Sequence, residues 1–182
     1  MVFVLRVSLS GIKGFFRVYQ VHGDTTLYTF HRQLRADLEF PQDQLIMFKA
    51  LTAEGGVVGR YGLFDLGSGT VDQVTLAAVV KAGASAFVYF YDVTNRKSVN
   101  ITVEATVEGP SAATALSPVL VEVKGPNPIE FENGYVAFED LPAKERHLPG
   151  EGDDEDYDDE DEDDEEPEDD DEEGKEIYDE NE

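Results

Sequence analysis

The residues of this 182-residue chain best suited to acid–base or metal chemistry are its three histidines, His22, His31 and His147. An imidazole titrates near neutral pH and binds metals, but either use needs a second ligand or a base partner nearby. The sequence places no such partner at a recognisable spacing. His31 lies one helical turn from Leu27 and from Leu34, so we expect it to border a buried apolar stripe and to serve the structure.

Three aspartates, Asp65, Asp72 and Asp92, are candidates for paired carboxylates in acid–base catalysis. No nucleophile or histidine accompanies them in a recognisable order. The segment Gly67-Ser-Gly-Thr70 is similar to a phosphate loop, but it lacks the third glycine of a dinucleotide fingerprint and the Gly-Lys-Thr of a P-loop. The chain also has no cysteine, which excludes thiolate metal sites. We therefore expect a protein that is not an enzyme, with no cofactor and no metal site.

We call residues 1–150 the body of the chain. Four basic residues form its candidate binding surface: Arg32, Arg35, Arg96 and Lys97. The first two lie off the apolar stripe of a predicted helix, and the other two lie at a predicted hairpin tip. With nearby tyrosines they could contact nucleic acid by charge and stacking. Residues 1–150, however, hold 16 acidic and 13 basic residues, and the sequence beyond them is strongly acidic. Because this charge repels phosphate, we expect no direct binding to nucleic acid.

The C-terminal stretch carries the strongest chemical signal, with 24 acidic residues and one lysine in residues 151–182. Carboxylates at this density repel one another and no apolar surface offsets chain entropy, which predicts a disordered tail. Such a tail either solubilises the protein or engages a basic surface, as a mimic of nucleic acid. An Ile-Tyr pair near its end is a candidate anchor for a partner. The candidate partner-binding residues are Asp153, Asp154, Asp158, Glu160, Asp163, Asp169, Glu172, Ile177 and Tyr178.

The element that must position the body's residues is a hairpin between Ala86 and Val107. Apolar and polar residues alternate from Ser98 to Val107, which predicts a strand with one dry face and one wet face. The preceding aromatic run, residues 87–91, has no polar side and predicts a strand covered on both faces. The two strands should pair and form the centre of the sheet.

The remaining elements follow from the same patterns. Further strands are predicted at 2–9, 15–21, 45–51 and 119–123. A glycine-rich loop with a short segment at 61–66 is predicted at 54–69, and a short closing segment at 135–141. A longer helix should begin at an Asp24 or Thr25 cap, bury Leu27, Phe30, Leu34 and Leu38, and end by Pro41. A short helix should span 75–81. The order predicts an α+β domain over residues 1–149, with a β-grasp-like mixed sheet and one long helix packed on it, followed by the acidic tail at 150–182.

The composition also limits the location of the protein. No apolar run approaches the roughly 20 residues that a membrane-spanning helix needs. The N-terminus lacks the basic start and the small-residue cleavage site of a signal peptide. We therefore expect a cytoplasmic protein without a membrane partner.

Three blocks of the sequence resemble the Ri-plasmid open-reading-frame-three family, whose members are also described as insertion-element passenger proteins. They are residues 21–27 followed by Phe30-His31, residues 76–92 ending in Tyr-Phe-Tyr-Asp, and Gly125-Pro-Asn-Pro128. The resemblance implies an α+β fold and names no reaction. The family often has a Phe-Gly-Asp-Asp-Trp-x-His turn after its Tyr-Asp strand. Residues 93–99 read Val-Thr-Asn-Arg-Lys-Ser-Val here, so chemistry done by that turn in relatives is not expected in this chain.

The function indicated by these features is a non-enzymatic, cytoplasmic interaction protein. Its acidic tail would engage a basic protein surface, such as that of a nucleic-acid-binding protein. The alternative is a nucleic-acid-associated, mobile-element-linked protein whose tail regulates access to the body. An enzyme of unknown reaction is the third and least supported hypothesis, because it needs a pocket with convergent polar groups.

Overall fold

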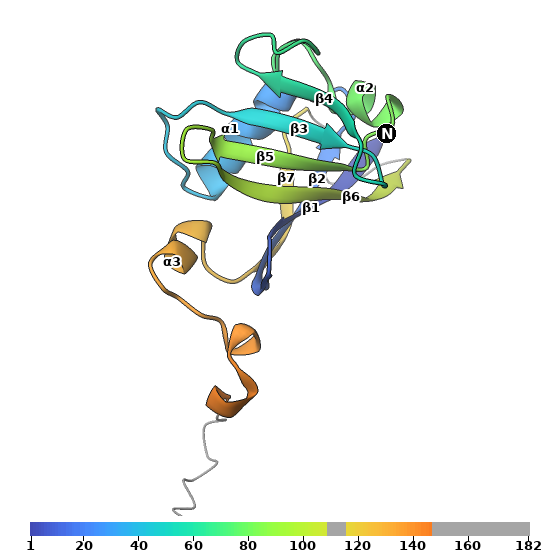
Figure 1. Cartoon of the computed structure of the whole chain (residues 1–182). Helices are drawn as coiled ribbons and strands as arrows, with labels where there is room; N and C mark the ends of the chain where they lie inside the picture. The colour runs from blue at the N-terminus through green and yellow to red at the C-terminus, as the bar shows by residue number, and fades with distance from the viewer. Residues whose placement is uncertain (109–115, 147–182) are drawn as a thin grey trace, which may run out of the picture. The chain divides into compact units, whose positions relative to one another are not determined.

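Seven strands form one sheet in the order β4-β3-β5-β6-β1-β2-β7 (Figure 1). The computed structural model describes residues 1–108 and 116–146. All ladders between the named strands are antiparallel, so the protein is α+β or mostly β, and the predicted mixed sheet of β-grasp type is not confirmed. The strands are β1 Val2–Leu9, β2 Ile12–His22, β3 Met47–Leu51, β4 Val57–Gly62, β5 Ala86–Asp92, β6 Lys97–Val107 and β7 Val119–Lys124.

Few helices accompany the sheet. They are α1 Leu27–Asp37, α2 Leu76–Lys81, α3 Pro128–Glu132 and two 3-10 turns, Phe138–Asp140 and Ala143–Glu145. The N-cap of α1 is Thr26, whose side chain accepts from the Thr29 amide, so the predicted caps at Asp24 and Thr25 are wrong. The helix ends at Asp37 with Leu38 as its cap, because Glu39 adopts a left-handed conformation at φ 56° before Pro41 is reached.

One face of the sheet forms the core, and α1 lies behind the sheet in the view of Figure 1. The predicted apolar stripe of α1 is confirmed, since Leu27, Phe30, Leu34 and Leu38 are all buried. They pack in one cluster with residues of β1, β2, β3, β5 and β6 and with Leu76 of α2. Burial of such a stripe supplies most of the stability of a helix this short.

The predicted central hairpin is confirmed, since β5 and β6 pair in the middle of the sheet. The core face is continuous across it, with Phe87 opposite Ile101 and Tyr89 opposite Val99, all four buried. The second face of β5 is less covered than predicted, because Val88 and Phe90 are only half-buried. No described helix lies over this outer face of the sheet (Figure 1).

The alternation in β6 does not keep one face throughout. Val103 pairs with Leu5 of β1, but Ala105 pairs with Val4, so the register shifts between them. A bulge of this kind moves the later residues to the opposite face of a sheet, because side chains alternate with a period of two. Ala105 and Val107 are accordingly exposed, and only the first half of the predicted dry face is buried.

Strand β4 corrects the prediction of a loop at 54–69. The strand pairs with β3, with Met47 opposite Gly62 and Lys49 opposite Arg60. Glycines within it depress strand propensity and hide the pattern, while Gly55 supplies the left-handed turn that joins the strands at φ 86°. The strand therefore depends on tertiary pairing more than on its own sequence.

The C-terminal arm, residues 125–146, packs against the β1–β2 hairpin. Asp140 accepts from the backbone amides of Lys13 and Gly14 at 2.8 and 3.0 Å. Arg17, which is buried, donates to the carbonyl oxygens of Lys124 and Gly125 at 2.7 and 3.0 Å. These contacts fix the start of α3 beside the sheet. In the described parts of the chain, no helix has the length and apolar character required to cross a membrane.

Candidate functional site

The acidic candidates, from Asp153 to Tyr178, lie outside the described residues, as does the domain boundary predicted at residue 149. His147 lies outside them too. The body up to Arg146 therefore holds the geometry that can be examined for a site.

The four basic candidates of the body do not act as one free patch. Arg35 donates to the carbonyl oxygens of Gln42 and Gln44 at 2.8 and 3.2 Å, which holds the α1–β3 connection. Lys97 pairs with Glu132 at 2.9 Å. Arg32 is exposed beside a polar hollow of about 300 Å³ between α1 and residues 117–118, and Arg96 is exposed in the β5–β6 turn with φ 56°. Two of the four candidates thus serve the structure.

His31 has the structural role that the sequence predicts. Its Nδ1 lies 2.6 Å from the hydroxyl of Tyr89, and the side chain is buried. Burial, followed by the charges of the nearby Arg35 and Arg32, lowers the pKa of His31 to about 4. The imidazole is therefore neutral at physiological pH and is largely shielded from solvent.

Within the described residues, no hydrogen bond joins the three aspartates considered for catalysis, and two of them organise turns. Asp65 accepts from the amides of Gly67 and Gly69 at 2.7 and 3.0 Å, and these bonds hold its pKa below the usual range. Asp92 accepts from Asn95, which lowers its pKa in the same way. Over the described ranges, no cluster of three or more acidic or histidine side chains has the geometry to hold a metal ion.

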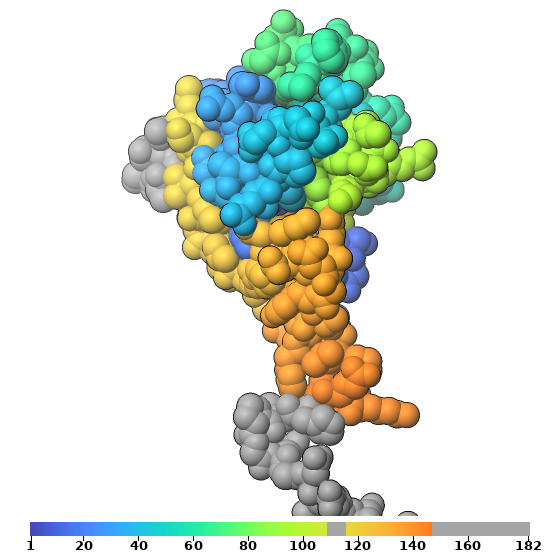
Figure 2. All heavy atoms as spheres, turned by 90° about the vertical axis from the view of Figure 1, so that its left-hand side faces the viewer, coloured from blue at the N-terminus to red at the C-terminus, as the bar shows by residue number. Residues whose placement is uncertain are grey.

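A small hollow of about 100 Å³, with both polar and apolar walls, lies where the α1–β3 connection, the β5–β6 turn and α3 meet. Figure 2 shows this junction, with the orange arm below the light-blue connection. The hydroxyl of Tyr91 donates to Glu132 at 3.0 Å, and Tyr91 stacks on Phe40 with ring centroids 3.8 Å apart. Burial first, and then Glu132, raise the pKa of Tyr91, so the phenol stays protonated. With its carboxylate shared by Tyr91 and Lys97, Glu132 joins α3 to the hairpin.

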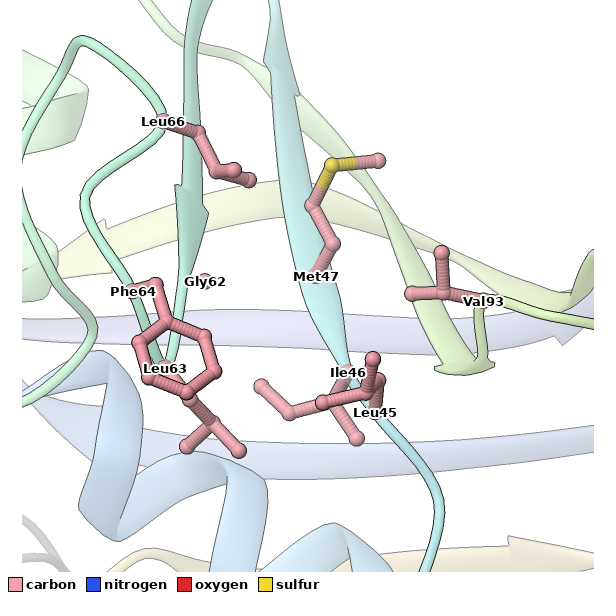
Figure 3. A pocket seen from close by; sticks show the side chains of 8 residues that line it. All are labelled: Leu45, Ile46, Met47, Gly62, Leu63, Phe64, Leu66 and Val93. Carbon is pink, nitrogen blue, oxygen red and sulfur yellow. The ribbon is translucent and has the colours of Figure 1, made fainter.

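The most distinct surface feature is an apolar hollow of about 200 Å³ at the end of β3 and β4 (Figure 3). We call it the apolar hollow throughout. Its side chains come from three segments that are far apart in the sequence and that strand pairing brings together. It is lined by Leu45, Ile46, Met47, Gly62, Leu63, Phe64, Leu66 and Val93.

Several large apolar side chains around the apolar hollow are open to solvent. Phe64 is 73% exposed, and Leu45 and Leu66 are each 52% exposed. Apolar side chains gathered on a surface in this way mark interaction sites, whereas isolated ones are ordinary. Hydrophobic residues without convergent polar groups can bind an apolar side chain, but they supply no group for catalysis.

The loop that presents Phe64 is braced by its own contacts. The Val71 amide donates to the Gly62 carbonyl at 3.0 Å, and a parallel bridge joins Gly62 to Thr70. The carboxylate of Asp65 holds the turn at Gly67 from within. Phe64 and Leu66 therefore stand on a loop of defined shape.

The apolar hollow is not among the sites predicted from the sequence. The cluster Leu63-Phe64-Asp65-Leu66 in a glycine-rich segment was an available signal, because three large apolar residues in a loop need an explanation. The sequence offers no such signal for Leu45 and Val93. They reach the site only through the pairing of β3 with β4 and β5.

Comparisons with known proteins agree with the motifs in the sequence. Among solved structures, a protein of unknown function from Methanosarcina mazei Go1 has a similar fold, with a TM-score of 0.53 and 18% sequence identity. The match covers 67% of this chain and 68% of that one. No curated protein matches the sequence. The profile of the plasmid pRiA4b ORF-3-like protein family matches residues 1–180, and the chain therefore belongs to that family.

Proposed function

We propose that this protein is a non-enzymatic, cytoplasmic interaction protein whose acidic C-terminal stretch engages a basic partner. The proposal rests on the distribution of acidic and basic residues along the chain. Residues 151–182 hold 24 acidic residues and one lysine, whereas about half of the basic residues of the body are occupied by contacts within the body and the others are spread over it.

Six of the 13 basic residues of the body have such contacts. Arg6 pairs with Glu104, Lys97 with Glu132 and Lys124 with Glu139. The other three donate to backbone carbonyl oxygens, and they are Arg17, Arg35 and Arg146. Drawing the buried Arg17 away to neutralise the acidic stretch would leave carbonyl oxygens without partners, which costs free energy, whereas the exposed ion pairs cost little to break.

The remaining basic residues come from seven different elements or turns: Lys13, Arg32, Lys49, Arg60, Lys81, Arg96 and Lys144. Their spread gives the body little basic density to match 24 carboxylates. An external partner with a dense lysine and arginine surface is the better electrostatic match.

The test is affinity capture with three forms of the protein: the full chain, a chain ending at Gly150, and a full-length chain in which residues 153–173 are replaced by serine and glycine. The full chain should retain a basic protein that the other two release, and 1 M salt should elute it. Equal capture by all three forms would contradict the proposal.

A second candidate function is supported by one feature of the outer sheet face. Lys49 lies directly opposite Arg60, and like charges in that position repel unless an anion lies between them. A nucleic-acid phosphate could supply that anion, and the acidic stretch would then regulate access. If truncation at Gly150 creates affinity for single-stranded DNA or RNA, and Lys49→Ala with Arg60→Ala removes it, this second function is the correct one.

A further inference from the structure

We infer that Asn133, together with Gly134, is a site of spontaneous covalent modification, at which the asparagine side chain is converted to aspartate and isoaspartate. The two residues directly follow α3 in the C-terminal arm, the orange part of the chain in Figure 1. The inference goes beyond the proposed function and needs no partner, because the reactants are two neighbouring residues and water.

The sequence singles out Asn133 among the asparagines. The reaction begins when the amide nitrogen of the following residue attacks the asparagine side chain and closes a succinimide ring. A Cβ atom on that following residue obstructs the attack, and glycine has none. Asn133 is the only asparagine of the chain that precedes a glycine. The other asparagines within the described residues precede Arg96, Ile101 and Pro128.

The surroundings of Asn133 leave its side chain free to react. Residues 132–136 are all exposed, and a Cβ atom built on Gly134 would meet nothing within 4 Å. In the parts of the chain that the structure describes, no hydrogen bond holds the side-chain amide of Asn133. The exposed Asn95 differs, because its side chain donates to Asp92 at 2.7 Å. Water therefore reaches Asn133, and no contact has to be broken before its side chain turns.

The backbone must open locally before the ring can close. Asn133 has ψ 3°, which turns the Gly134 nitrogen away from the asparagine side chain. The Gly134 amide donates to the Phe131 carbonyl at 3.2 Å, and the Tyr135 amide donates to the Glu130 carbonyl at 2.9 Å. Both bonds lie at the exposed end of a five-residue helix, and each contributes about 1 kcal/mol. Opening this turn therefore costs less than global unfolding and supplies the reactive form.

The chemical step is balanced by water alone. The Gly134 amide loses its proton to base, and its nitrogen attacks the side-chain carbonyl carbon of Asn133. A new carbon–nitrogen bond forms, the side-chain carbon–nitrogen bond breaks, and ammonia leaves. Water then adds to one of the two ring carbonyls and opens the succinimide to aspartate or to isoaspartate. No group is oxidised or reduced.

The products should loosen the contact between α3 and the β5–β6 hairpin. Either product adds a carboxylate beside Glu132, at the C-terminal end of a helix, where negative charge is unfavourable. Glu132 is the residue that accepts from Tyr91 and pairs with Lys97. Isoaspartate also adds an extra backbone atom to the turn, so the Tyr135 amide can no longer meet its carbonyl partner in the same geometry.

The experiment incubates the full chain in ¹⁸O-labelled water at mildly acidic and mildly alkaline pH. Mass spectrometry of its peptides locates the heavy oxygen, and an isoaspartate-specific methyltransferase detects isoaspartate. We expect conversion at Asn133 to be at least about tenfold faster than at Asn95 or Asn100. The rate should rise with pH, because the attacking amide nitrogen must first lose its proton, and isoaspartate should be part of the product.

Two glycine variants separate the attack itself from loss of stability. Gly134→Ala should slow conversion at Asn133 at least about fivefold, because it adds the obstructing Cβ. Gly83→Ala should leave the rate unchanged, since Gly83 also has a positive φ, 109°, and open space around its Cβ position but follows no asparagine. Equal rates at Asn133 and Asn95, product without isoaspartate, or an unchanged rate in Gly134→Ala would each overturn the inference.

Discussion

At the scale of single residues, the two faces of β6 have opposite tolerance for charge. Ile101 is completely buried among core side chains, and Thr102 is exposed on the outer face. Ile101→Asp should lower the free energy of unfolding by several kcal/mol, because it places an unpaired carboxylate in the core. Thr102→Asp should cost about 1 kcal/mol or less. Urea unfolding measures both, and similar costs would show that the faces are assigned wrongly.

The buried histidine predicts a specific pH dependence of stability. The pKa of His31 is about 4 in the folded protein and about 6.5 in an unfolded chain, so the unfolded state binds more protons between these values. Stability from this residue is present above pH 6.5 and is lost as the pH falls toward 4. The difference between the folded and unfolded pKa of His31 corresponds to roughly 3 kcal/mol of stability, at about 1.4 kcal/mol per pKa unit.

Two variants separate the causes of this dependence. His31→Gln should make the free energy of unfolding fall less steeply than in the native protein between pH 6.5 and 4.5, as measured in urea. Tyr89→Phe removes the hydroxyl at 2.6 Å but leaves the imidazole buried, and burial is the main cause of the lowered pKa. That variant should keep most of the native slope. An unchanged slope in His31→Gln would refute the explanation.

At the scale of elements, the C-terminal arm depends on close backbone contact at Gly125. A Cβ atom there would lie 2.0 Å from the carbonyl oxygen of Gly14, and φ is 73°. Gly125→Ala should therefore destabilise the protein by more than the roughly 1 kcal/mol of a left-handed alanine, because the arm must move away from β2. The change in melting temperature measures this effect.

Gly134 supplies the matched control, because its φ is 96° but a Cβ atom there would meet nothing within 4 Å. Gly134→Ala should show only the conformational cost, about 1 kcal/mol. Equal losses in the two variants would mean that the contact between Gly125 and Gly14 contributes nothing to the packing of the arm.

Elements with strong periodicity could be predicted from the sequence, and those that depend on pairing could not. Strand β1, helix α2, the stripe of α1 and the central hairpin follow from spacing, because each buries a regular face. Strand β4 and the bulge near Ala105 are set by neighbouring strands, so their own residues do not reveal them. The apolar hollow has the same origin. Its walls come from residues 45–47, 62–66 and 93, which only the sheet brings together.

At the scale of the whole molecule, the body should fold without the acidic stretch. The apolar residues of the core end well before residue 150, and like charges in residues 151–182 repel one another. A chain ending at Gly150 should show an unchanged or slightly higher melting temperature by calorimetry, with the same cooperativity. A broad or strongly lowered transition would show that residues 151–182 contribute to the fold.

The central claim is that the charge of the acidic stretch drives association with a basic partner. The most direct measurement is the association rate of the captured partner with the native chain and with the variant that has serine and glycine at residues 153–173. At low salt the neutral variant should associate at least about tenfold more slowly, and near 1 M salt the two rates should agree, because screening removes the attraction. Equal rates at low salt would contradict the claim and leave the acidic stretch with a solubilising role alone.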